Sequence, residues 1–203
     1  MKENLKKMFD SMKAPISKFL MFVAFALMMT CVAASAQDAE AILSKIESKA
    51  PQNISGKFTE VRIAAGASES AGEKLSGDLV FKTEGYLSMD YTNGEQFVID
   101  GSSVKITRAG KTQVFDASKN MMMKGLSHML VYAFQGKAKL LSQEQKTTLL
   151  VNKEGDEYVV ILAAQAKAAR GYSRAVFRYD ASTCRIRTME LVEFSGAVTR
   201  YAL

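Results

Sequence analysis

The chain has 203 residues, of which 48% are apolar, and it carries 27 Lys and Arg against 21 Asp and Glu for a net charge of +6. This length is enough for one domain with a sizeable core. The basic residues form no cluster, which excludes the electrostatic surface that nucleic-acid binding requires.

The N-terminal segment has the three parts of a secretory signal. Five Lys and two acidic residues occupy the first 18 positions, an apolar run follows from Phe19 to Met29, and small residues lead to Ala36. This pattern predicts cleavage between Ala36 and Gln37. The apolar run is shorter than the roughly 20 residues that span a bilayer, so we favour a cleaved signal over a membrane anchor. Lipid attachment at Cys31 is a further alternative.

Removal of residues 1–36 changes the charge and the cysteine content of the chain. It takes away five Lys and two acidic residues, which leaves 22 basic against 19 acidic residues in a mature domain of residues 37–203. Cys184 is then the only cysteine, so the domain has no internal disulfide in an oxidising compartment. We interpret Cys184 as a small apolar strand residue and not as a nucleophile.

The first element that we expect after the signal is a helix over residues 38–50. Ile42, Leu43 and Ile46 fall on one face of it, and Pro51 ends it. From residue 54 to residue 116 the apolar pattern changes to a period of two, and turn pairs such as Asn93-Gly94 and Asp100-Gly101 recur every eight to ten residues. Short alternating runs between such turns predict an antiparallel meander.

Residues 121–141 interrupt this meander with a Met-rich, apolar stretch that we expect to be helical. Gly136 is a reasonable end for the helix. Alternating runs then return over residues 147–152, 158–164, 172–179, 185–194 and 198–202. The predicted fold is therefore mainly β (α+β), with a single curved antiparallel sheet as an incomplete β-barrel, an N-terminal helix and a helical lid.

The residues that catalysis or metal binding would need are sparse. His128 is the only histidine, it lies within an apolar segment, and no nucleophile elbow accompanies it. No metal-ligand spacing and no glycine-rich phosphate loop occur. We therefore expect no enzyme and no cofactor, and we interpret His128 as a helix-surface or half-buried residue.

The positive signal is a surplus of apolar residues in the insert, which begins with three consecutive Met. Methionine is flexible and polarisable, and it suits surfaces that must fit variable apolar partners. Two interpretations follow from this pattern. Either the insert fills the sheet as ordinary core, or it is a lid over a cavity for acyl chains or another apolar ligand.

Four segments of the first meander resemble LolA-type outer-membrane lipoprotein carriers. They are ISGKFTEV at residues 54–61, LSGDLVFK at 75–82, LSMDY at 87–91 and QFVIDG at 96–101. The first is similar to the family's opening strand with its Phe-Thr-Gln-like triplet, and the second to its Gly-x-Leu strand. The order of helix, meander, helical insert and second meander agrees, so the resemblance covers roughly residues 38–203.

The resemblance implies a periplasmic carrier that shields acyl chains of lipoproteins, or a related lipid, in an apolar cavity. Such carriers receive cargo from an inner-membrane ABC exporter and deliver it to an outer-membrane acceptor. Shielding is needed because each exposed CH₂ group costs about 0.8 kcal/mol. We expect a monomer, with no nucleic-acid partner.

Two features depart from the family. Thr83 and Glu84 stand where the family has an Arg-Pro pair, whose Arg holds the lid closed, and Arg62 is a possible substitute for this latch. The chain also ends at Leu203, before the family's apolar, Pro-containing C-terminal stretch. The handover partner and the cargo therefore stay open.

The candidate ligand-binding residues alternate along the strands or lie on the insert. They are Phe58, Leu79, Phe81, Leu87, Met89, Tyr91, Phe97, Ile99, Met122, Leu126, Met129 and Leu130. The rival hypothesis is a non-catalytic envelope module for stress sensing or assembly, with the same half-barrel fold. Its sheet would be filled by its own side chains, and its insert would dock a protein partner.

Overall fold

A computed structural model describes residues 38–166 and 171–203. The chain divides into two compact units, Met1–Ala41 and Ile42–Leu203. The predicted signal, its cleavage site at Ala36 and Gln37, and Cys31 lie outside the described residues. Residues 38–49 are helical, and Leu43 and Ile46 of this helix are buried in the second unit, as their spacing predicts.

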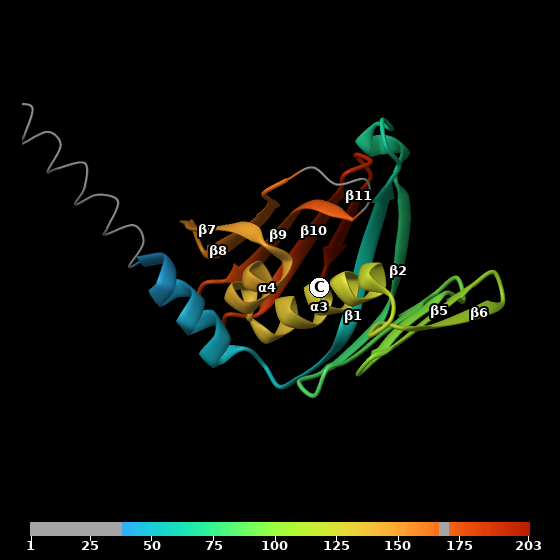
Figure 1. Ribbon diagram of the computed structural model, residues 1–203, viewed down its shortest axis with the longest axis horizontal. Helices are drawn as coiled ribbons and strands as arrows, with labels where there is room; N and C mark the ends of the chain where they lie inside the picture. Colours follow the sequence, from blue (N-terminus) through green and yellow to red (C-terminus); the bar gives the residue numbers. More distant parts are fainter. Residues whose placement is uncertain (1–37, 167–170) are drawn as a thin grey trace, which may run out of the picture. The chain divides into compact units, whose positions relative to one another are not determined.

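Eleven antiparallel strands form one sheet in the order β6-β5-β4-β3-β2-β1-β11-β10-β9-β8-β7 (Figure 1). The strands before the helical insert are β1 (Asn53–Ile63), β2 (Glu73–Lys82), β3 (Tyr86–Tyr91), β4 (Gln96–Asp100), β5 (Ser103–Arg108) and β6 (Lys111–Asp116), with the 3-10 turn η1 (Glu69–Ala71) before β2. Those after it are β7 (Thr147–Glu154), β8 (Glu157–Ala164), β9 (Tyr172–Asp180), β10 (Ile186–Glu193) and β11 (Val198–Ala202).

The turns between these strands follow from their glycines. Gly94 and Gly101 adopt positive φ angles of 85° and 56°, which residues with a Cβ atom rarely reach. They join β3 to β4 and β4 to β5, where the sequence predicts Asn-Gly and Asp-Gly turns. The sheet is open, because β6 and β7 are its two ends and do not pair with each other.

The insert between β6 and β7 consists of two helices, α3 (Met121–Gln135) and α4 (Ala138–Gln145). The Asn120 side chain accepts hydrogen bonds from the backbone N–H groups of Met122 and Met123 at the start of α3. Gly136 ends α3 with φ 68°, as predicted. The sequence pattern ends the insert at residue 141, whereas α4 continues to Gln145, because α4 buries only two residues and has little apolar periodicity.

Both helices lie across one face of the sheet, which we call the inner face (Figure 1). Two contacts identify its core. The rings of Phe81 on β2 and Phe134 on α3 stack with centroids 4.9 Å apart. The Tyr179 hydroxyl on β9 donates a 2.8 Å hydrogen bond to the Ala133 carbonyl of α3. The predicted fold, an open curved antiparallel sheet with helices, is confirmed.

One residue differs from its predicted place. Cys184 is buried with φ 58° in the turn between β9 and β10, and not in a strand. The Asp180 carboxylate causes this turn, because it accepts hydrogen bonds from the backbone N–H groups of Ser182 and Thr183. The Cys184 N–H then bonds the Asp180 carbonyl at 2.8 Å. The strand pattern therefore begins only at Ile186.

Candidate functional site

The strand register places the apolar residues of successive strands side by side on the inner face. Leu79 of β2 pairs with Met89 of β3, and Met89 pairs with Phe97 of β4. In the other half of the sheet, Met189 of β10 pairs with Tyr201 of β11 on one side and with Phe177 of β9 on the other. Because side chains alternate between the two faces of a strand, these columns form one continuous apolar wall opposite α3.

The twelve predicted ligand-binding residues are brought together here, with one exception. Nine of them are buried in a single apolar cluster with the inner side chains of α3. Phe97 and Leu126 are half-buried and pack against the same cluster. Met122 lies apart, with 53% of its surface exposed. The structure thus shows that these residues share a face, while their contact with a ligand stays a prediction.

The C-terminal end of α3 is firmly attached to the rest of the domain. Besides the Tyr179 bond to Ala133, the Gln135 side chain donates a 2.7 Å hydrogen bond to the Thr83 carbonyl at the end of β2. Gly136 also lies close to Ile46, which belongs to the helix of residues 38–49. A Cβ atom added at Gly136 would be 2.9 Å from the Ile46 side chain. This end of the insert is therefore fixed by both polar and apolar contacts.

The N-terminal end of α3 is different. Met121 and Met122 are 80% and 53% exposed, although large apolar side chains are normally the most buried. With Leu126 and Tyr172 of β9 they line a groove of about 330 Å³. Its volume is at the low end of the range for small-ligand sites. We call it the lid groove.

Helix α4 contacts the outer side of α3 through polar side chains. Glu144 accepts a 3.2 Å hydrogen bond from the Tyr132 hydroxyl and lies 2.6 Å from Nδ1 of His128. The Gln145 amide donates a 3.0 Å hydrogen bond to the Gly125 carbonyl. These contacts make the two helices one unit. His128 is half-buried between them, as expected from its apolar surroundings.

A group of charged residues stands on the inner face beside the apolar wall. Glu60 of β1 is only 2% exposed, and its carboxylate accepts hydrogen bonds from the Tyr91 hydroxyl and, at 2.6 Å, from Nε of Arg62. Arg62 also donates to Glu95 at 3.0 Å, and Glu95 pairs with Arg108 at 3.1 Å. We call these five residues the inner polar cluster.

The pKa values of this cluster reflect burial and charge together. Burial, followed by the nearby Glu60 carboxylate, raises the pKa of Tyr91. Burial alone would lower the pKa of Arg62, but its hydrogen bonds to Glu60 and Glu95 outweigh that effect and raise it. Tyr172 of the lid groove has its pKa raised to about 12 by burial first, and then by the charges of Glu193 and Glu60. The charge of Glu60 in the cluster thus affects Tyr172 in the lid groove.

Arg62 was predicted as a substitute for the lid latch. In the described part of the chain it forms ion pairs with Glu60, Glu95 and, at 3.7 Å, Glu73, all of which belong to the sheet and its turns. Hydrogen bonds between the insert and the rest of the described domain include those of Tyr179 and Gln135. Sequence reasoning missed both, because neither residue stands out until the strands are aligned with α3. A latch role for Arg62 stays a prediction.

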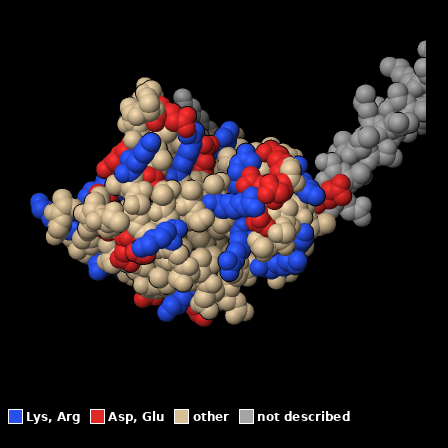
Figure 2. Space-filling view, turned by 180° about the vertical axis from the view of Figure 1, so that it is seen from behind, with Lys and Arg blue, Asp and Glu red and all other residues tan. Residues whose placement is uncertain are grey.

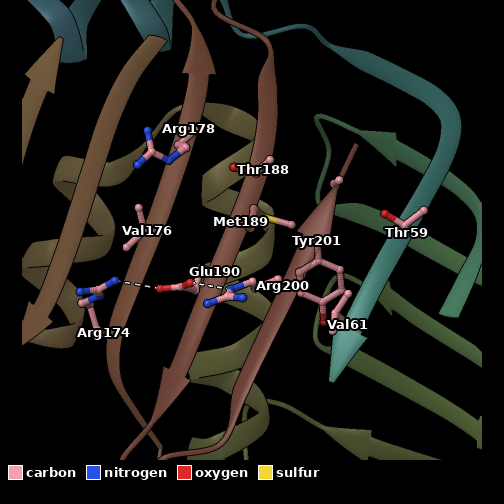
Figure 3. A pocket seen from close by; sticks show the side chains of 11 residues that line it. Thr59, Val61, Arg174, Val176, Arg178, Thr188, Met189, Glu190, Arg200 and Tyr201 are labelled. Carbon is pink, nitrogen blue, oxygen red and sulfur yellow. Dashed lines mark hydrogen bonds and ion pairs between the residues drawn. The ribbon is translucent and has the colours of Figure 1, made fainter. Parts of the chain in front are cut away.

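The outer face of the sheet carries charged residues of both signs around a central area without charges (Figure 2). A groove of about 460 Å³ crosses β1, β11, β10 and β9 there, with Thr59 and Val176 in it (Figure 3). Glu190 in this groove pairs with both Arg174 and Arg200 at 2.8 Å. The side chains of Arg174 and Arg200 are 51% and 40% exposed, and that of Glu190 is 23% exposed.

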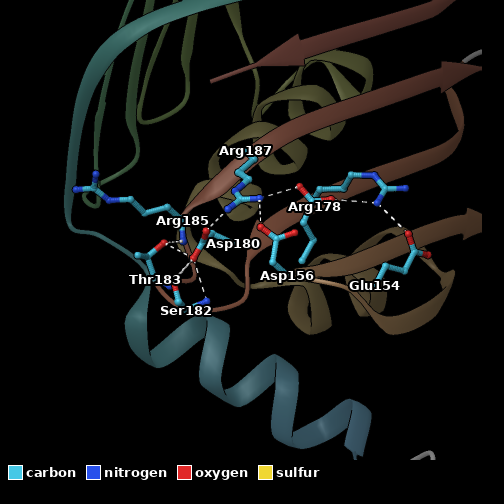
Figure 4. A network of polar contacts seen from close by, with 9 residues as sticks. Glu154, Asp156, Arg178, Asp180, Ser182, Thr183, Arg185 and Arg187 are labelled. Carbon is cyan, nitrogen blue, oxygen red and sulfur yellow. Dashed lines mark hydrogen bonds and ion pairs between the residues drawn. The ribbon is translucent and has the colours of Figure 1, made fainter.

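A second polar network joins the turns at one end of β8, β9 and β10 (Figure 4). Arg187 pairs with Asp180 and with Asp156 at 2.9 Å, and Arg178 pairs with Glu154 at 2.9 Å. Hydrogen bonds from Ser182 and Thr183 lower the pKa of Asp180. Each of these charged groups has a partner, so the network fixes the turns.

Nowhere in residues 38–166 and 171–203 do three or more His, Cys, Asp or Glu gather as a metal site. No helix in these same ranges has the length and apolar character to cross a membrane.

No family model matches the chain, and no curated protein sequence matches it. Solved structures with similar folds include a LolA superfamily protein from Nitrosomonas europaea, at 12% identity and a TM-score of 0.38 over 81% of this chain and 90% of that one. A putative outer membrane lipoprotein-sorting protein domain from Vibrio parahaemolyticus has 10% identity and a TM-score of 0.42 over 82% and 90%.

MucB in complex with MucA(peri) is also similar, at 13% identity and a TM-score of 0.33 over 81% of this chain and 53% of that one. The superfamily that the sequence resembles is thus among the structures similar to this chain.

Proposed function

We propose that this protein is a non-catalytic periplasmic carrier that shields the acyl chains of lipoproteins, or of a related lipid, between the sheet and the α3–α4 lid. The observation that carries the proposal is the unequal attachment of α3. Its C-terminal end is bonded to Thr83, just after β2, and to β9, whereas its N-terminal end exposes Met121 and Met122 beside the lid groove.

This asymmetry gives the lid a direction of opening. Movement about the fixed end near Gly136 would lift the Met-rich end and widen the lid groove toward the apolar wall. An acyl chain of about 16 carbons gains roughly 0.8 kcal/mol for each CH₂ group that leaves water, which offsets the cost of separating the buried side chains. The empty state then stays closed, because its side chains fill the space themselves.

Binding of an uncharged apolar probe tests the proposal. The purified protein is titrated with the fluorophore N-phenyl-1-naphthylamine, and a synthetic diacylated lipopeptide is then added as competitor. We expect saturable fluorescence enhancement and displacement of the probe. Native mass spectrometry of protein isolated from its source envelope should show bound lipid. A ligand-free mass together with no probe binding would refute the carrier.

A matched pair of variants locates the entrance. Met122→Glu places a charge in the lid groove, and we expect it to weaken probe binding by about tenfold or more, because a charge opposes entry of an apolar chain. Val114→Glu is the control, since Val114 is 66% exposed on β6 and is not among the groove's lining residues. Equal effects of the two substitutions would contradict entry at the lid groove.

The second candidate is a module that binds a protein partner through the insert. The observation in its favour is the inner face itself, where nine of the predicted cavity residues are already buried against side chains of this chain. Such a module would bind no probe or lipopeptide. The titration therefore separates the two functions.

A further inference from the structure

The inner polar cluster contains two carboxylates and two guanidinium groups, so its cations are already paired. Arg62 also lies 3.7 Å from Glu73, a residue outside the cluster whose side chain is 57% exposed. With Glu73 included, three carboxylates stand beside two guanidinium groups, a net charge of −1. Arg62, the cation that could otherwise bind an anionic ligand, is thus already paired with carboxylates.

Glu60 is the member of the cluster that faces the apolar wall. It lies two residues after the buried Phe58 on β1, and therefore on the same face, and it lies opposite Tyr201 on β11. The ring of Tyr91, whose hydroxyl bonds Glu60, also packs edge-on against Phe58 with centroids 5.0 Å apart. A carboxylate therefore stands within the apolar cluster and not at its solvent edge.

The Glu60 carboxylate retains the capacity to accept further hydrogen bonds. Its two oxygens offer about four lone-pair sites, and the two described bonds, from Arg62 and Tyr91, occupy one on each oxygen. A hydroxyl or an ammonium group brought beside it would be a favourable donor. A carboxylate or phosphate would be a like charge in a poorly solvated place, which is costly.

The cluster is also placed near the groove through which the acyl chain would enter. Tyr172 lines the lid groove with Met121 and Met122, and it packs against the same apolar cluster as Phe58 and Tyr91, the residues beside Glu60. The charge of Glu60 is also among the causes that raise the pKa of Tyr172. A ligand whose chain fills the inner face would therefore have its polar head near Glu60.

We propose that the inner polar cluster makes the site selective for acyl ligands whose polar head is an uncharged hydrogen-bond donor or a cation, and that it discriminates against anionic heads. This inference rests on the proposed carrier function. The selectivity comes from a repulsive element, the buried Glu60 carboxylate, as well as from the hydrogen bonds that this carboxylate can still accept.

Three ligands with the same 16-carbon chain and different heads test this selectivity. Hexadecylamine, monopalmitoylglycerol and hexadecanoate are used below their micellar concentrations at pH 7.5 to displace N-phenyl-1-naphthylamine. We expect the amine and the glyceride to bind about tenfold more tightly than the acid, which is the effect of one unfavourable charge contact of about 1.4 kcal/mol. Equal or tighter binding of hexadecanoate would overturn the inference.

Two substitutions of the same kind assign the effect to the inner face. Glu60→Gln removes the inward carboxylate, and we expect hexadecanoate to come within about threefold of the other ligands. Glu190→Gln is the matched control, because Glu190 also pairs with arginines but lies in the outer groove (Figure 3). An unchanged ranking in Glu60→Gln, or the same change in Glu190→Gln, would contradict the assignment.

The outcomes keep this inference separate from the proposed function. Displacement by all three ligands without preference refutes the selectivity but supports a carrier, whereas displacement by none refutes both. If Glu60→Gln does not fold, Glu95→Gln removes another carboxylate of the cluster. It is expected to shift the ranking in the same direction, and an unchanged ranking there counts against the proposal.

Discussion

The two faces of the sheet carry similar ion pairs in opposite surroundings. On the inner face, Glu60 is 2% exposed and is bonded to Arg62 and Tyr91. On the outer face, Glu190 pairs with Arg174 and Arg200 in an open groove, where both arginines are at least 40% exposed. An exposed pair contributes little to stability because water and salt screen it. Removing one partner of a buried pair leaves an uncompensated group.

The largest expected effect concerns the apolar part of the inner face. Phe81 is fully buried and stacks on Phe134. Phe81→Ala should lower the free energy of unfolding by about 3–5 kcal/mol, through lost burial and the cavity that remains. Urea denaturation followed by circular dichroism measures the change. A loss below 1 kcal/mol would show that α3 does not pack on the sheet as described.

The next effect compares the buried ion pair with the exposed one. Glu60→Gln should lower the free energy of unfolding by about 1–3 kcal/mol, because Arg62 and Tyr91 lose a charged acceptor in a buried place. Arg62 keeps its bond to Glu95, which limits the loss. The same urea titration measures it. An effect no larger than that of Glu190→Gln would remove the contrast between the two faces.

Loss of the lid's attachment should have a smaller effect on stability and a visible one on binding. Tyr179→Phe removes the hydroxyl that bonds the Ala133 carbonyl, at a cost of about 1 kcal/mol. If this bond holds α3 closed, the association rate of N-phenyl-1-naphthylamine should rise in stopped-flow fluorescence. Tyr158→Phe is the control, because its hydroxyl accepts a hydrogen bond from Lys45 instead. An unchanged rate in Tyr179→Phe would argue against a hinge at this end.

The smallest effect belongs to the outer face. Glu190→Gln should change the free energy of unfolding by less than about 1 kcal/mol, and by still less in 1 M salt. Burial tends to raise the pKa of Glu190, but hydrogen bonds from Arg200 and Arg174 outweigh it and lower the pKa. The pair therefore stabilises the fold above the unfolded pKa, and this contribution is lost as the pH falls through the lower folded pKa. Urea titrations of both proteins at pH 7 and pH 3 should show the difference shrinking in acid.

The sequence predicts the strands and turns of this molecule better than the individual contacts between residues far apart in the chain. Alternation and turn glycines such as Gly94 are local signals, and they predict the strands and the single open sheet. The apolar pattern also groups Leu79 with Phe81, and Leu87 with Met89, because residues two apart in a strand share a face.

The parts that sequence reasoning missed depend on contacts between distant segments. The sequence indicates only that Glu60 is a polar residue in a strand. Its burial becomes apparent from its pairing with Tyr201 and from the hydrogen bond that the Tyr91 hydroxyl donates to it. Arg62 was predicted as a lid latch, and its partners Glu60 and Glu95 could not be predicted from its neighbours in the chain. Cys184 was misplaced because the turn that contains it depends on the Asp180 side chain.

The strand order has a consequence for how the chain folds. Every strand pair in the described sheet joins consecutive strands except β1 with β11, where Thr59 pairs with Ala202. The two meanders are therefore built from contacts of low sequence separation, which form quickly. Closing the β1–β11 seam requires the ordering of a loop of more than a hundred residues, so we expect it to form late. Until then both meanders expose an unpaired edge, and that interval is when the chain is most prone to associate with other copies of itself.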